Sequence, residues 1–162
     1  MVGDIALIVT AVGVVGGVLG LRQSYRERLR QFESRYVERY WQILDRLSLD
    51  ALSGSCPDII ADSDNKATRS YLFLCEDELE MRANGYIADR TYELWADGII
   101  NQLEQPIFAK VWKQVSEEHE KREMFPFANL NNLLSAGDSG YDPLTIGTWR
   151  RWLRGLAGLS GV

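Results

Sequence analysis

The chain contains little cysteine and histidine, two residue types that often carry enzyme chemistry. Its 162 residues include two cysteines and one histidine, and so few cysteines predict reduced thiols rather than a disulfide framework. Ser116 stands three residues before His119, so the Glu-x-x-His motif of carboxylate-bridged metal sites does not occur. The sequence also has no nucleophile-elbow serine and no phosphate-binding glycine loop. We therefore expect a non-enzymatic protein with no catalytic residue, no metal and no cofactor.

The chain has no excess of positive charge, because its 23 acidic residues outnumber its 18 basic residues and the net charge is −5 at pH 7. A chain with this balance is not expected to bind nucleic acid. The charge is uneven: residues 22–30 are basic, residues 58–104 are acidic, and residues 150–154 are basic again. The acidic cluster Glu76-Asp77-Glu78-Glu80 is typical of a solvated helix face, in which Glu76 lies closest to the apolar side and is a candidate to pair with an upstream arginine.

One stretch lacks charge altogether. Residues 5–21 read IALIVTAVGVVGGVLGL and lie between Asp4 and Arg22. A run of this length is at the short end of the membrane-spanning range, and a helix is the form that pairs its backbone polar groups in lipid. Arginines crowd residues 22–30 on its carboxyl side, so the positive-inside rule places the amino terminus outside and the rest of the chain in the cytoplasm. We expect residues 1–21 to be a transmembrane anchor in contact with the lipid bilayer.

The glycines of this run form a stripe. Two pairs are spaced four residues apart and fall on one side of a helix: Gly13, Gly16, Gly17 and Gly20. Small residues at this spacing let two membrane helices approach closely. We therefore expect a homo-oligomer that associates through its spans. The alternative is that these glycines only reflect the frequency of glycine in membrane helices.

No strand-like alternation occurs after the anchor, and the apolar spacing is helical throughout, so we expect an all-α protein. Residues 22–53 are predicted to continue the span as one long stem helix that ends near Leu52. Its apolar stripe includes Leu29, Phe32, Tyr36 and Tyr40. This stripe is expected to pack the stem and to continue the contact between spans.

Residues 54–162 are predicted to form a small irregular helical bundle that packs with the stem. Helices are expected over residues 65–84, 90–102, from Pro106 onward, 128–135 and 148–156. Gly85 has the position of a left-handed residue that ends a helix, and Asp89 that of an N-cap. Gly98 is expected to permit close packing of its helix. Cys56 is expected in an accessible loop, and Cys75 in the core.

The last helix has two contrasting faces. Ile146, Trp149, Trp152, Leu153 and Leu156 fill one arc, and Arg150, Arg151 and Arg154 fill the opposite arc. We expect the apolar arc to close the bundle core and the arginines to face solvent or the acidic region. The alternative is an interfacial helix in which these residues contact anionic lipid or a partner.

A resemblance adds to this picture. The stem contains RYVERYWQIL, and residues 71–100 read YLFLCEDELEMRANGYIADRTYELWADGII. A span followed by these segments resembles a family of small bacterial membrane-anchored helical proteins of unknown function, over about the first two-thirds of the chain. The resemblance implies a single-pass protein of the bacterial inner membrane with an all-α cytoplasmic domain. It supplies no catalytic residues.

These observations favour a membrane-anchored, non-enzymatic interaction or regulatory protein. It would self-associate and bind an unidentified protein partner through its helical domain. One alternative is an oligomeric membrane effector that forms a pore or perturbs the membrane when triggered. Another is an enzyme with a carboxylate site in the bundle core.

Overall fold

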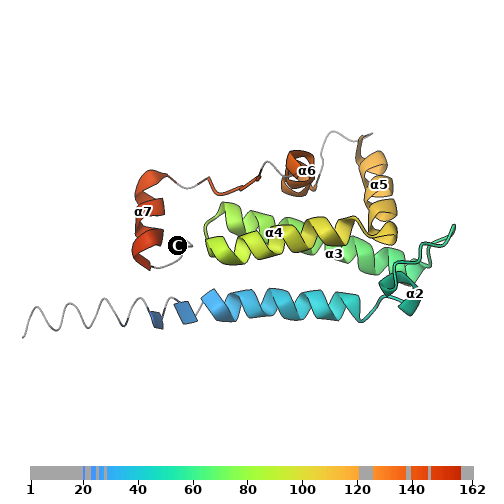
Figure 1. The fold of residues 1–162 in the computed structure, drawn as a ribbon, viewed down its shortest axis with the longest axis horizontal. Coiled ribbons are helices and arrows are strands. Elements are labelled where there is room, and N and C mark those ends of the chain that lie inside the picture. Colours follow the sequence, from blue (N-terminus) through green and yellow to red (C-terminus); the bar gives the residue numbers. More distant parts are fainter. Residues whose placement is uncertain are drawn as a thin grey trace, which may run out of the picture.

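The computed structural model describes residues 20, 23–24, 26–27, 29–120, 126–137, 140–145 and 147–157. All regular structure in this part of the chain is helical, which confirms the all-α prediction (Figure 1). No helix among these residues combines the length and the apolar character that crossing a bilayer requires. The predicted span, residues 5–21, lies outside the described residues except for Gly20.

The stem helix, described without interruption over residues 29–44, ends earlier than predicted. The chain turns at residues 45–48, and a separate short helix, α2 (Leu49–Leu52), follows. Ser48 causes this break because it is the N-cap of α2, where its hydroxyl accepts a hydrogen bond from the Ala51 N–H. The buried Asp64 carboxylate fixes Ser48 by accepting from its N–H at 2.8 Å and its hydroxyl at 2.7 Å.

Two longer helices form a hairpin beside the stem helix. They are α3 (Asp62–Ala83) and α4 (Asp89–Leu103), and Gly85 in the turn has a φ of 82°, the left-handed conformation predicted for it. In Figure 1 the stem helix, α3 and α4 run along the long axis, with α3 antiparallel to the other two. Asp89 does not cap α4 as predicted, because it is the first helical residue and Ala88 is the N-cap.

Three further helices complete the bundle: α5 (Pro106–Glu120), α6 (Ala128–Ala136) and α7 (Thr148–Ala157). Figure 1 shows α5 and α7 crosswise at opposite ends of the hairpin. The predicted pairing of Glu76 with a stem arginine is wrong. Its carboxylate accepts hydrogen bonds from the Asn129 and Leu130 N–H groups, which stabilises the amino-terminal end of α6.

Aromatic rings connect the stem helix to the rest of the core. Tyr36 is buried, with its ring centroid 5.8 Å from that of Trp95 on α4. The Tyr40 ring lies 6.0 Å from Tyr71 on α3, and Phe32 also packs against the core. Leu29 is half-buried. The described residues of the stem stripe therefore pack within the chain's own domain, against α3 and α4.

The orientation of α7 is the reverse of the one predicted. Trp149 is 67% exposed and Trp152 is 59% exposed, and Leu153 also faces outward. Arg154, predicted to face solvent or the acidic region, is 7% exposed and packs against the turn between α3 and α4. Ile146 and the side chain of Leu156 lie outside the described residues. The described apolar face of α7 thus does not close the core.

Candidate functional site

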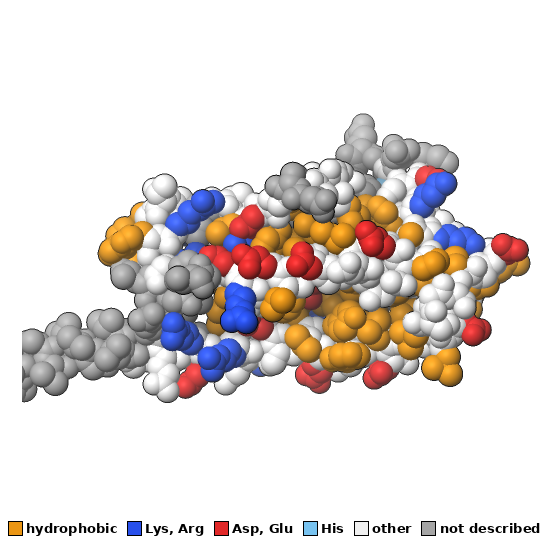
Figure 2. All heavy atoms as spheres, viewed as in Figure 1, with side chains coloured by type: hydrophobic (Ala, Val, Ile, Leu, Met, Phe, Trp, Pro, Cys, Tyr) orange, Lys and Arg blue, Asp and Glu red, His pale blue; other side chains and the backbone are white. Residues whose placement is uncertain are grey.

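The candidate site is an open groove between the stem helix and α4, with α3 as its floor. Figure 2 shows hydrophobic side chains gathered along this face of the molecule. The groove has a volume of about 250 Å³. We call it the aromatic groove, and its lining residues are Val37, Tyr40, Trp41, Tyr71, Glu78, Leu94, Trp95, Gly98 and Ile99.

The walls of the aromatic groove expose large apolar side chains. Trp41 is 58% exposed and Leu94 is 65% exposed, and both lie on the helices that border the groove. Gly98 keeps the wall open, because a Cβ added there would have no heavy atom within 4 Å. The expectation that Gly98 permits close helix packing is therefore wrong within the described structure. A groove bordered by exposed apolar side chains offers an amphipathic helix a surface on which to pack.

Glu78 gives this apolar groove a titratable group. Burial raises the pKa of Glu78 to about 8; the neighbouring Asp77 also raises it, and Arg39 opposes the shift. Arg39 forms its ion pair, at 3.4 Å, with Asp77 instead. A carboxyl group is thus held between aromatic walls, where a cation could pair with it and lie against the rings.

The acidic cluster of the sequence does not form a joint site. Glu76 supports α6, Asp77 pairs with Arg39, Glu78 lines the aromatic groove and Glu80 is exposed. Across the described part of the chain, no three His, Cys, Asp or Glu side chains are grouped so that they could hold a metal ion. The four carboxylates serve separate structural or surface roles in this arrangement.

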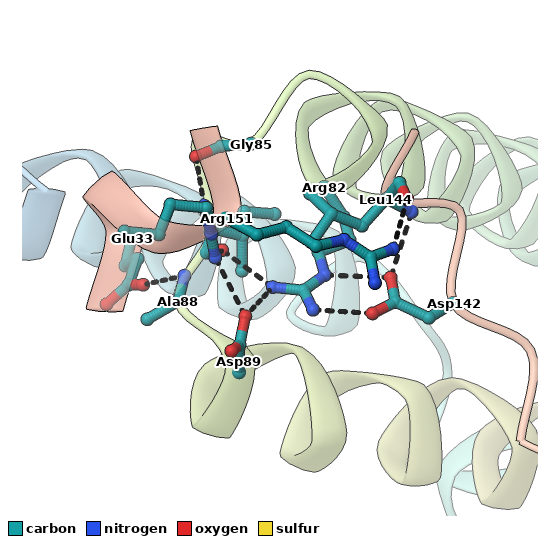
Figure 3. A network of polar contacts seen from close by, with 10 residues as sticks. Glu33, Arg82, Gly85, Ala88, Asp89, Asp142, Leu144 and Arg151 are labelled. Atoms are coloured by element: carbon teal, nitrogen blue, oxygen red, sulfur yellow. Dashed lines mark hydrogen bonds and ion pairs between the residues drawn. The ribbon is translucent and has the colours of Figure 1, made fainter. Parts of the chain in front are cut away.

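A second polar feature, which we call the arginine network, joins α7 to the turn between α3 and α4 (Figure 3). It consists of Arg82, Asp89, Asp142 and Arg154. Arg82 is 2% exposed and binds Asp142 through two hydrogen bonds, at 2.9 and 2.6 Å, and Asp89 at 2.5 Å. Arg154 binds Asp89 at 2.8 Å. Because each buried arginine has a carboxylate partner, the network avoids an uncompensated buried charge.

The arginine network also satisfies backbone carbonyls of the turn. Arg82 and Arg154 both donate to the Ile87 carbonyl, and Arg154 donates to the Gly85 carbonyl as well. Burial raises the pKa of Asp89, but hydrogen bonds from Arg82 and Arg154 outweigh that effect and hold it below its ordinary value. The pKa of Asp142 is lowered in the same way: burial raises it, but hydrogen bonds from Arg82 and the Leu144 N–H outweigh that effect. The network therefore fixes α7 by its arginine side.

The predicted site residues fall into three groups. Gly13, Gly16 and Gly17 lie outside the described residues, whereas Gly20 is exposed and has open space around it. The stem residues pack within the domain. Of the α7 residues, Trp149, Arg150, Arg151 and Trp152 are exposed, while Arg154 belongs to the arginine network.

Two charged residues of the candidate sites were not recognised in the sequence: Glu78 was assigned to a solvated helix face, and Arg82 was not considered as a site residue. Glu78 and Arg82 continue the buried α3 stripe formed by Tyr71 and Cys75, at alternating spacings of four and three residues. This spacing places both charges on the packed side of α3, which is the signal that could have identified them. Outside this stripe, the predicted thiol environments are confirmed: Cys56 is exposed and Cys75 is buried.

Comparison with family models, with curated proteins and with solved structures finds no match for this chain. The resemblance to small bacterial membrane-anchored proteins therefore stays a prediction. The fold and the two sites described above are the basis of the functional proposal.

Proposed function

We propose that this protein is a membrane-anchored, non-enzymatic interaction protein. Its amino-terminal run spans the bacterial inner membrane and self-associates through the glycine stripe, and its helical domain lies in the cytoplasm. The domain binds a protein partner in the aromatic groove. The observation that carries the proposal is the exposed apolar surface of Trp41 and Leu94 in a groove that is also lined by Glu78.

The shape and chemistry of the aromatic groove define the partner. A groove between two helices accepts a third helix that inserts apolar side chains at helical spacing. Glu78 favours a partner residue that brings a positive charge, and the surrounding Tyr40, Trp41 and Trp95 rings also favour a cation. The occupant is therefore an amphipathic helix of another protein with a lysine or arginine on its apolar face.

Photo-cross-linking in native membranes tests this assignment. A benzophenone side chain replaces Leu94 at the groove or, as the control, Ile59, which is exposed elsewhere on the surface. We expect a discrete protein adduct from position 94 whose attached peptide is an amphipathic helix with a basic residue. Position 59 should not give this adduct.

A second substitution, Gly98→Leu, fills the groove in the same cross-linking experiment. The variant should fold, because the added side chain enters open space and leucine is a better helix former than glycine by about 0.8 kcal/mol. We expect it to abolish the adduct, whereas Gly147→Leu, at another glycine with open space, should preserve it. An adduct that survives Gly98→Leu, or one formed only with another copy of this chain, would contradict the proposed partner.

A further inference from the structure

The outward face of α7 is the most exposed aromatic surface outside the aromatic groove in the described chain. The Trp149 and Trp152 rings are stacked, with centroids 6.0 Å apart and an interplanar angle of 24°. Leu153 is exposed beside them. Burying this face in the bundle would shield it from water, yet the arginine network turns it outward. We therefore expect the tryptophan face of α7 to contact something outside the domain.

The position of α7 indicates what that occupant is. Figure 1 places α7 at the end of the molecule where the stem helix begins, with its axis crosswise to the stem. The stem helix follows the predicted span in the sequence, and its amino-terminal part lies at this same end. Figure 2 shows hydrophobic side chains on the outer surface of this end. A bilayer that lies across this end of the stem helix would therefore run parallel to α7 and contact its outer face.

We propose that Trp149, Trp152 and Leu153 form a second membrane contact, on which α7 lies in the plane of the lipid headgroups. Tryptophan is enriched at this depth because its ring is apolar while its N–H remains hydrogen-bonded. An interfacial helix lies parallel to the surface with its apolar face in the lipid and basic residues nearby, and Arg150 and Arg151 are exposed on α7.

The arginine network gives this membrane contact a fixed geometry. Arg154 binds the turn between α3 and α4, so α7 is held against the bundle by the side that does not carry the tryptophans. The span and α7 then hold the domain to the bilayer at two separate places, which restricts how the domain can rotate. This inference rests on the proposed membrane anchor.

Tryptophan quenching by brominated lipid tests the contact in the full chain. The protein is reconstituted in vesicles of phosphatidylcholine and phosphatidylglycerol, with bromine atoms near the top of the acyl chains. We expect strong quenching in the wild type and loss of most of it in the double variant Trp149→Phe with Trp152→Phe. The matched control, Trp41→Phe, removes the exposed tryptophan of the groove and should retain the quenching.

The outcomes separate the two proposals. A protein that floats with the vesicles but is not quenched, or is quenched equally in the double variant, overturns the α7 contact and leaves the anchor intact. A protein that does not float with the vesicles overturns both proposals. The double variant should melt at the wild-type temperature, since both side chains are exposed; a marked decrease would mean that protein covers this face and would also overturn the contact.

Discussion

At the scale of single residues, the charges on α3 are the least expected feature. Glu78 and Arg82 lie on the packed side of this helix, but their surroundings differ. Arg82 binds two carboxylates, whereas Arg39, the arginine that opposes the raised pKa of Glu78, pairs with Asp77. Arg82 therefore stays charged at low structural cost, whereas ionisation of Glu78 opposes folding until a cation arrives.

This difference predicts how stability depends on pH. The pKa of Glu78 is raised from 4.5 to about 8, so the folded chain binds more protons than the unfolded chain between these values. The free energy of unfolding should therefore decrease through Glu78 as pH rises across this window. One pKa unit corresponds to about 1.4 kcal/mol, and after allowing for screening by groove water we expect an effect of about 2 kcal/mol.

Denaturant unfolding of wild type and Glu78→Gln at pH 5 and pH 9 measures this effect. The variant should lose about 2 kcal/mol less than the wild type between the two values, because its side chain does not ionise. Glu80→Gln is the matched control, since Glu80 is exposed on the same helix and its removal should leave the wild-type dependence unchanged. If Glu78→Gln and the wild type lose the same free energy of unfolding between pH 5 and pH 9, the pKa of Glu78 is not raised in the folded chain, and this prediction is wrong.

At the scale of elements, α7 is held by polar contacts. Arg154 donates to the Gly85 and Ile87 carbonyls and to Asp89, while the described tryptophans of α7 face outward. We expect Arg154→Met to release α7 from the turn and to lower the free energy of unfolding by about 2 kcal/mol, because the Gly85 carbonyl loses its Arg154 donor, while the Ile87 carbonyl and Asp89 keep only Arg82. Hydrogen exchange should become faster in α7 but remain slow in the centre of α3.

Arg150→Met is the matched control for α7, because Arg150 is an exposed arginine on the same helix. It should leave the exchange of α7 at the wild-type rate. Acid should mimic Arg154→Met, since Asp89 and Asp142 have lowered pKa values and their stabilisation is lost as pH falls through them. Slow exchange of α7 in Arg154→Met would contradict docking through the arginine network.

The elements were more predictable from the sequence than their orientation. Helical spacing, Gly85 and Pro106 identified the helices from α3 to α7, because these signals are local. The break at Ser48 depends on Asp64, sixteen residues away, and the orientation of α7 depends on carbonyls in a distant turn. Apolar patterning alone favoured the tryptophan face of α7 for the core, since it contains no information on unsatisfied backbone groups elsewhere.

At the scale of the whole molecule, the proposed surfaces have different positions. The aromatic groove lies along the stem helix and α4, while the exposed face of α7 lies at the end where the stem begins. A domain attached to the bilayer by this end would keep the groove open to a cytoplasmic partner. The stem helix contributes both to the core and to the groove. The binding surface is therefore built partly on the helix that follows the proposed anchor in the sequence.

Thiol labelling tests the central claim, a helical domain anchored at the cytoplasmic side of the membrane. The chain suits this measurement because Cys56 is exposed while Cys75 is buried, and burial raises the pKa of the Cys75 thiol. A membrane-impermeant maleimide is added to spheroplasts before and after permeabilisation, with Cys56→Ser as the control. The account predicts that the protein remains in the membrane after alkaline carbonate extraction and that Cys56 is labelled only after permeabilisation. Labelling of Cys56 in intact spheroplasts, or release of the protein by carbonate, would contradict it.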